Sequence, residues 1–173
     1  MRDKETVDIG LKAALTGHLV FSTLHTNDAP STITRLQNMG TPDYLISAAC
    51  QLVVAQRLAR RNCSDCKIPD DDVNPKVLQD LGFSAEQASR AKAFKGKGCP
   101  KCNDTGYKGR QGIYEILKVT EELQDGILKN LTIPEMEKVA KKEGFQSMQE
   151  VGAGYINDGV LSLEEYQRTL FIS

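Results

Sequence analysis

Two pairs of cysteines, each with two residues between its members, constrain the fold of this 173-residue chain more than any other feature. The pairs are Cys63-Ser-Asp-Cys66 and Cys99-Pro-Lys-Cys102. A two-residue spacing lets both thiolates of a knuckle turn toward one ion, and two knuckles supply the four sulfurs of a tetrahedral Zn²⁺ site. Such a set leaves no position open for water, so we expect a structural zinc site rather than a catalytic one. The alternative is four free thiols.

The surroundings of the cysteines support this interpretation. Gly98 and Gly106 flank the second pair, where they would relieve steric strain in a tight turn. Cys50 lies among apolar residues, as a buried and inert cysteine does. Four cysteines in tight pairs, in a chain without a secretion signal, favour a reducing compartment and a metal over disulfides.

Composition excludes several classes of protein. A formal net charge of −1 gives no field that favours nucleic acid or an anionic membrane. No run of about 18 apolar residues predicts a membrane-spanning helix, and the charged N-terminus is unlike a signal peptide. We therefore expect a soluble protein whose contact with any membrane is indirect.

The segment 17–30 combines an apolar run with a polar loop. Leu19–Leu24 predicts a buried strand, which ends in the loop His25–Asp28. Asp28 can cap the next helix, with Pro30 in its first turn. Because ligands bind beyond the carboxyl ends of strands in open α/β sheets, we expect His25 to stand where chemistry occurs.

Periodicity predicts the other elements. Residues 3–15 form a helix, and Tyr44–Arg61 form one long helix or two short ones that are buried on several sides. Two short helices lie between the cysteine pairs, and a strand follows them. The last third consists of four helices. These predicted elements are Pro75–Leu81, Ala85–Ala93, the strand Gly112–Val119, and helices that begin near Thr120, Thr132, Met148 and Ser162.

Four signatures in a fixed order resemble one family. They are Met1-Arg2-Asp3, the segment Gly17–Pro30, Ala55-Gln-Arg-Leu58 before the cysteines, and Gly109-Arg-Gln-Gly-Ile-Tyr-Glu-Ile-Leu117 after them. Together with the cysteines they resemble the motor ATPases that drive type II secretion and type IV pilus assembly, in the branch with a tetracysteine element. The first signature resembles the end of that family's Walker B segment, and the second resembles its His box.

The resemblance implies an α/β fold in three parts. Residues 1–61 would be the C-terminal portion of a RecA-like ATPase core, residues 62–109 an inserted tetracysteine zinc subdomain, and residues 110–173 a return strand with a C-terminal helical bundle. It also implies a cytoplasmic homo-hexamer, peripheral at the bacterial inner membrane, that hydrolyses ATP with Mg²⁺ and acts on an inner-membrane platform protein. No nucleic acid is expected as a partner.

The phosphate-binding loop of such an ATPase is not in this sequence. No G-x-x-x-x-G-K-[ST] pattern occurs, and Gly96-Lys-Gly98 lacks both the first glycine and the Ser or Thr that holds Mg²⁺. A phosphoryl-transfer site needs a phosphate cradle, a metal and a residue that positions the water. We therefore expect this chain alone to be inactive, and to work with the upstream half of the same ATPase and with neighbouring subunits.

The resemblance assigns nucleotide roles to four residues. His25 would approach the γ-phosphate of ATP and report its presence, which suits an imidazole whose pKa lies near working pH. Arg2, His18 and Thr26 would also lie near the nucleotide. Simpler interpretations stay open: a polar loop residue for His25, a cap on the preceding helix for His18, and an exposed helix start for Arg2.

Other basic residues leave alternatives open. Arg57, Arg60 and Arg61 either stabilise phosphate charge across a subunit boundary or, as we favour, compensate the charge at a helix C-terminus. Lysines near the second cysteine pair form a solvated face or dock an acidic partner; they are Lys92, Lys95, Lys97, Lys101 and Lys108.

Two rival functions lack any ATPase role. One is a zinc-ribbon module that binds nucleic acid or protein, which the lysines support and the near-zero net charge and 6% aromatic content oppose. The other is a stand-alone zinc scaffold. Cys99–Gly106 also resembles, weakly, the zinc repeats of DnaJ-type chaperones.

Overall fold

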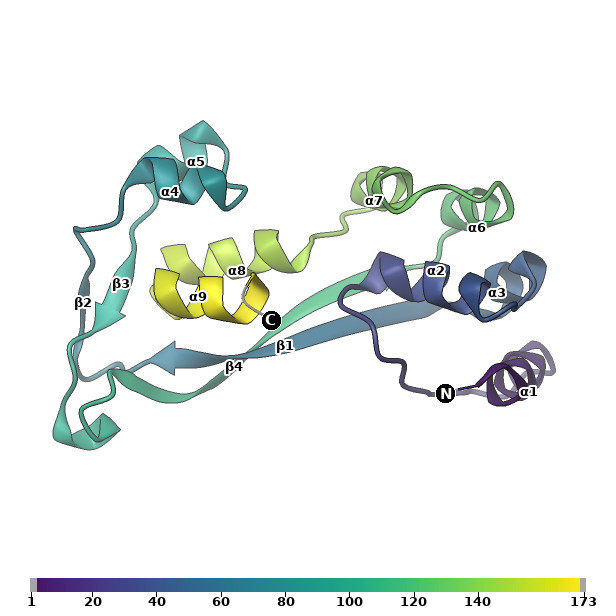
Figure 1. The fold of residues 1–173 in the computed structure, drawn as a ribbon, viewed down its shortest axis with the longest axis horizontal. Helices are drawn as coiled ribbons and strands as arrows, with labels where there is room; N and C mark the ends of the chain where they lie inside the picture. Colours follow the sequence, from purple (N-terminus) through teal and green to yellow (C-terminus); the bar gives the residue numbers. More distant parts are fainter. Residues whose placement is uncertain (1–2, 172–173) are drawn as a thin grey trace. The chain divides into compact units, whose positions relative to one another are not determined.

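The computed structural model describes residues 3–171, with the backbone alone at positions 87 and 90 (Figure 1). Helices and strands follow one another in the order α1 (Lys4–Leu15), α2 (Ala29–Asn38), α3 (Asp43–Ala49), β1 (Leu52–Asn62), β2 (Lys67–Pro69), α4 (Pro75–Asp80), α5 (Ala85–Arg90), β3 (Phe94–Gly96), the 3₁₀ turn η1 (Pro100–Cys102), β4 (Tyr107–Lys118), α6 (Glu121–Leu128), α7 (Ile133–Lys142), α8 (Met148–Asn157) and α9 (Leu163–Leu170). The strands pair as β1 with β4 and β2 with β3. Among these described elements, no helix has both the length and the apolarity to cross a membrane.

The chain divides into two compact units, and the division falls inside β1 and β4. The first unit comprises Met1–Ala55 and Glu115–Gln146, and the second comprises Gln56–Tyr114 and Ser147–Ser173. The four helices predicted in the last third are present, but they are shared between the units. Helices α6 and α7 belong to the first, and α8 and α9 belong to the second. The three-part functional division at residues 61 and 109 stays a prediction.

The first unit is built from helices that bury one face each. Helix α3 packs against α1 and α6, and α2 packs against α3 and α7. The core consists of apolar side chains from each of these elements and from β4: Val7, Ile33, Ile46, Leu117, Leu123, Ile127 and Met136. Asp28 caps α2 as predicted, because its carboxylate accepts the backbone N–H of Ser31 at 2.7 Å, and Asp3 caps α1 in the same way by accepting the N–H of Thr6 at 2.9 Å.

The strand predicted at Leu19–Leu24 is not formed, since residues 18–26 have no regular structure. The side chains of Leu19 and Phe21 are 80% and 85% exposed. A strand persists only where a neighbouring strand satisfies its backbone groups. Among the described residues, the sheets contain only β1 with β4 and β2 with β3. The prediction of a buried strand is therefore wrong in this structure.

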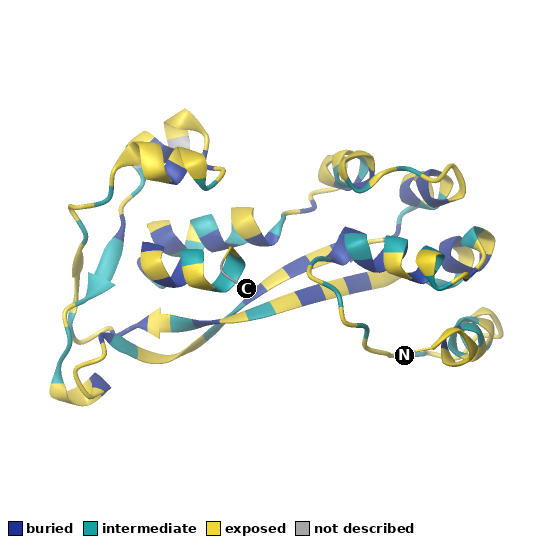
Figure 2. Cartoon of the chain, in the orientation of Figure 1, coloured by how far each residue is buried: buried dark blue, intermediate teal, exposed yellow. Residues whose placement is uncertain are grey.

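The helix predicted over Tyr44–Arg61, as one long segment or two short ones, is present only in its first part and is wrong from Leu52 onward. Helix α3 ends at Ala49, and the residues from Leu52 onward form β1, which pairs with β4. Figure 2 shows buried and exposed residues alternating along β1, as they do in a half-buried strand. Buried Val53, Ala55 and Ala59 alternate with exposed Leu52, Val54 and Leu58. Because both faces of this strand carry apolar residues, the sequence pattern resembled a helix buried all round.

The second unit combines the cysteine region with α8 and α9. Helix α8 packs on α9, and α4 packs on α5. The ring of Phe83, just after α4, meets the buried ring of Tyr166 edge-on, with 6.0 Å between centroids. The side-chain amide of Asn62, at the end of β1, donates to the carbonyl oxygens of Phe94 and Gly159, both at 3.2 Å. This buried amide ties β1 to β3 and to the loop between α8 and α9.

The helices of the last third start at the predicted positions, but their predicted capping bonds form only in part. Thr132 and Glu135 form a complete capping box at α7. Ser162 caps α9 by accepting the N–H of Glu165 at 3.1 Å, but the carboxylate of Glu165 does not return to the cap. Thr120 precedes α6 without a side-chain capping bond. The backbone therefore begins each helix where expected, while side-chain roles depend on tertiary partners.

Candidate metal centre and histidine loop

The four paired cysteines converge on one point in the second unit. Their sulfur atoms all lie within 4.8 Å of one another. Sγ of Cys63 is 3.9 Å from Sγ of Cys99, Sγ of Cys66 is 3.9 Å from Sγ of Cys102, and the sulfurs of Cys99 and Cys102 are 3.7 Å apart. A tetrahedron with Zn–S bonds of about 2.3 Å has sulfur–sulfur edges of about 3.8 Å. The four sulfurs therefore fit a tetrahedral metal ion.

Backbone turns that few residues can adopt shape the second knuckle. Gly98 and Gly106 have φ angles of +94° and +75°, as their predicted role requires. A Cβ atom at Gly106 would lie 2.5 Å from the carbonyl oxygen of Gly96. The tight turn lets the N–H groups of Cys99 and Gly106 donate to Sγ of Cys102, at 3.2 and 3.3 Å. N–H donors of this kind stabilise a thiolate that binds a metal.

The protonation of the sulfurs follows from these contacts. Burial by itself raises the pKa of the Cys102 thiol, but the N–H groups of Cys99 and Gly106 and the neighbouring thiols lower that pKa to about 7. Burial and the neighbouring thiols raise the pKa of Cys66 to about 12. The N–H group of Gly98 lowers this pKa, but by less than burial raises it. The cluster thus includes one thiol, that of Cys102, which ionises more readily than an ordinary cysteine to the anionic form that binds a metal.

Two lysines of the cysteine region form ion pairs. Lys101, between Cys99 and Cys102 in sequence, forms an ion pair with Asp65 of the first knuckle at 2.6 Å. Lys95 pairs with Asp70 at 2.7 Å and with Asp72 at 2.8 Å. Two of the lysines predicted to form a basic face are therefore paired with carboxylates of the same unit.

The histidine loop, His25–Asp28, lies in the first unit and leads into α2. His25 is exposed, and Oγ1 of Thr26 is 2.8 Å from Oγ1 of Thr32 in the first turns of α2. Nδ1 of His18 lies 3.1 Å from Oγ1 of Thr16 and 3.3 Å from the carbonyl oxygen of Ala13, at the end of α1. Arg2 lies outside the described residues. The nucleotide roles of all four residues stay predictions.

A buried glutamate that the sequence analysis missed holds the start of α2. Oε1 of Glu115 accepts the backbone N–H of Ala29 at 2.7 Å, and the residue is only 3% exposed. Glu115 points inward from β4 together with Ile113 and Leu117, in strict alternation. A glutamate at an inward position of an alternating strand was the signal that could have revealed it. Glu115 and Asp28 thus both bind the N-terminal N–H groups of α2.

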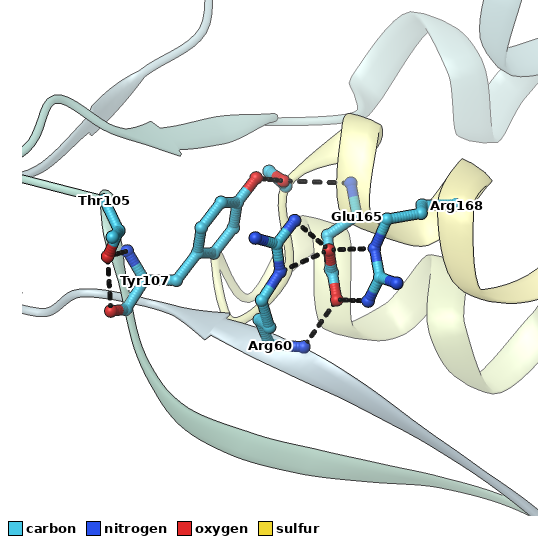
Figure 3. A network of polar contacts seen from close by, with 6 residues as sticks. Arg60, Thr105, Tyr107, Glu165 and Arg168 are labelled. Carbon is cyan, nitrogen blue, oxygen red and sulfur yellow. Dashed lines mark hydrogen bonds and ion pairs between the residues drawn. The ribbon is translucent and has the colours of Figure 1, made fainter.

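The arginines predicted at a helix end belong to strand β1, so helix charge compensation is ruled out for them. Arg60 instead pairs with Glu165 of α9 (Figure 3). Its Nη2 and Nε lie 2.7 and 2.9 Å from Oε2 of that carboxylate, and its guanidinium stacks 4.2 Å from the ring centroid of Tyr107. Arg168 binds the same carboxylate from within α9.

A family model for type II/IV secretion system proteins matches residues 1–168. The chain belongs to this family. The predicted family is therefore confirmed, while the assignment of its individual signatures stays a prediction.

Curated relatives in the type II/IV secretion system family include both kinds of motor. The chain is 43% identical over 165 residues to the type IV pilus assembly ATPase PilB of Myxococcus xanthus, covering 95% of this chain and 29% of that protein. It is 44% identical over 168 residues to PilB of Pseudomonas aeruginosa, covering 97% of this chain and 29% of that protein. It is 41% identical over 169 residues to the type II secretion system ATPase E of Vibrio cholerae, covering 97% of this chain and 33% of that protein. The chain thus spans about a third of the length of these relatives.

A solved structure extends the comparison to the fold. The pilus retraction motor PilT with bound ADP resembles this member of the secretion family with a TM-score of 0.61 and 25% sequence identity. The match covers 97% of this chain and 37% of PilT. Together with the clustered cysteines, this similarity confirms the predicted α/β ATPase fold.

Proposed function

We propose that this chain works as part of an ATPase that powers type IV pilus assembly or type II protein secretion. The observation that carries the proposal is the identity of 41–44% to both kinds of motor, over at least 95% of the chain. Because the chain spans about a third of those proteins, the phosphate cradle and the Mg²⁺ site would come from the upstream half of the same ATPase. Neighbouring subunits of a homo-hexamer would complete the assembly.

In this scheme the histidine loop senses the nucleotide. His25 is exposed just before α2, and Asp28 and Glu115 hold the first N–H groups of that helix. An imidazole that donates to the γ-phosphate of ATP would favour the conformation in which the two halves are close. Since α2 is held to β4 through Glu115, a shift of the loop would be transmitted to the strand.

The four cysteines would hold a structural Zn²⁺ ion. Three of the sulfur–sulfur distances are 3.7–3.9 Å, as in a tetrahedral site, and four thiolates leave no position for a substrate. The ion would fix the two knuckles at the base of the second unit, so that this unit presents a rigid surface. We propose an inner-membrane platform protein as the partner of such an ATPase. The motor would then be cytoplasmic, peripheral at the inner membrane, and free of nucleic acid.

A chimeric motor tests this function directly. The chain would replace the matching 165 residues of Myxococcus xanthus PilB, and ATP hydrolysis would be measured for the chimera and for the chain alone. We expect turnover by the chimera and none by the chain alone. The variant His25→Ala in the chimera should lower turnover at least tenfold. The variant His18→Ala, at the end of α1, tests whether such a loss is specific to the histidine loop. A folded chimera without turnover, or unchanged turnover in His25→Ala, would contradict the motor or the sensing role respectively.

A further inference from the structure

Three arginines line a hollow in the second unit. The hollow has a volume of about 470 Å³, and its lining consists of Leu58 and Arg60 from β1, Arg110 from β4 and Arg168 from α9. We call it the arginine hollow. Its size is within the range of small-molecule sites. One apolar side chain and three guanidinium groups make it a cationic surface rather than an apolar one.

Two of the three guanidinium groups are fixed before any ligand arrives. The carboxylate of Glu165 is fully buried, and it binds Arg60 and Arg168 at the same time (Figure 3). Oε2 accepts Nε of Arg60 at 2.9 Å and Nε of Arg168 at 2.8 Å, while Oε1 accepts Nη2 of Arg168 at 2.5 Å and the backbone N–H of Arg60 at 2.7 Å. Long side chains that are already ordered lose little entropy on binding a ligand.

The fixed arginines keep donors for a further acceptor. A guanidinium has five N–H groups, and Glu165 engages only the Nε and Nη2 sides of each arginine. Within residues 3–171, Nη1 of Arg60 and Nη1 of Arg168 have no acceptor. One buried carboxylate also cannot neutralise three guanidinium groups. The exposed Glu164 acts on Arg168 from the same helix, and the hollow keeps an excess of positive charge.

We propose that the arginine hollow binds a phosphate group. Guanidinium groups match the oxygens of phosphate with paired N–H donors, and a buried carboxylate that orients the arginines adds to their selectivity. The hollow belongs to the second unit, whereas the histidine loop belongs to the first. Phosphate binding here goes beyond the proposed function and does not depend on it, because the chain can be tested without any ATP hydrolysis.

Calorimetric titration of the zinc-loaded chain with inorganic phosphate tests the proposal. Ionic strength is held constant with chloride, and glutarate serves as a carboxylate probe. We expect one saturable phosphate site in the millimolar range, and weaker binding of glutarate. Arg110→Gln should weaken phosphate binding about tenfold or more, since one charge-assisted contact is lost. Arg61→Gln is the matched control, because Arg61 is exposed on β1 and does not line the hollow.

Three results would overturn the assignment. They are the absence of saturable phosphate binding, an equal loss in Arg110→Gln and Arg61→Gln, and binding of glutarate in preference to phosphate. The variant Arg110→Lys separates charge from geometry, since it keeps the charge and loses the planar fork. Full recovery in that variant would be a fourth result against a site shaped for phosphate. Arg110 lies outside the Glu165 network, so these variants leave the buried ion pairs intact.

Discussion

The buried carboxylate of Glu165 should contribute a large part of the stability of the second unit. Replacing it as Glu165→Gln keeps the shape of the side chain and removes its charge. The guanidinium groups of Arg60 and Arg168 then lose their common anion. Removing one partner of a buried ion pair is costly, because the remaining charges keep their desolvation penalty. We therefore expect Glu165→Gln to lower the free energy of unfolding at pH 7.

The magnitude follows from the pKa of Glu165. Burial by itself raises that pKa, but hydrogen bonds from Arg168 and Arg60 outweigh burial and lower it from 4.5 to about 2. Since one pKa unit corresponds to about 1.4 kcal/mol, the ionised carboxylate stabilises the fold by about 3 kcal/mol at pH 7. A depressed pKa gives stability that is complete above about pH 4.5 to 5 and is lost as the pH falls toward 2. The difference between wild type and variant should shrink over that range.

Urea unfolding followed by tyrosine fluorescence measures this difference. Four of the five tyrosines, Tyr107, Tyr114, Tyr155 and Tyr166, belong to the second unit, so the signal reports mainly on it. Both proteins are measured with a chelator at every pH, which removes the effect of metal release. The control is Glu164→Gln at the exposed neighbouring position. A loss below about 0.5 kcal/mol at pH 7, or a loss that stays constant down to pH 2.5, would refute the reasoning.

Three further predictions concern the metal centre and α2. Native mass spectrometry should find one Zn²⁺ per chain and none in the double variant Cys63→Ser with Cys66→Ser; retained zinc would exclude the four-sulfur site. Gly106→Ala should cost about 1–3 kcal/mol of stability and weaken zinc binding, because Gly106 has a φ of +75° and an added Cβ would meet a carbonyl oxygen of β3. The control is Gly154→Ala in α8, where an added Cβ meets no atom within 4 Å. That variant should be neutral or stabilising. Glu115→Leu should speed hydrogen exchange at the amide of Ala29, the first of α2, at least tenfold. Glu115→Gln keeps an acceptor and should retain most of the protection. Equal exchange in both variants would exclude the hydrogen bond from Ala29 to Glu115.

Local chemistry explains which parts of the fold could be predicted. Asp28 begins α2 and Thr132 begins α7 because a capping side chain satisfies N–H groups within its own turn. The prediction failed at Leu52–Asn62, where both faces of a strand carry apolar residues and mimic a buried helix. It failed again at Leu19–Leu24, whose apolar pattern specifies an extended chain but cannot supply a neighbouring strand.

The features of the candidate sites that follow from local sequence could also be predicted, and those that need long-range contacts could not. The sequence alone predicted the cluster of four cysteines and the family, because a two-residue spacing closes a knuckle locally and the signatures lie in order along the chain. Only the tertiary structure decided the roles of Glu115, Arg60 and Glu165. Glu115 reaches an amide 86 positions away, and Arg60 meets a carboxylate 105 positions away. Hydrogen bonds and ion pairs over such separations depend on how β1, β4 and the helices pack, which no local pattern encodes.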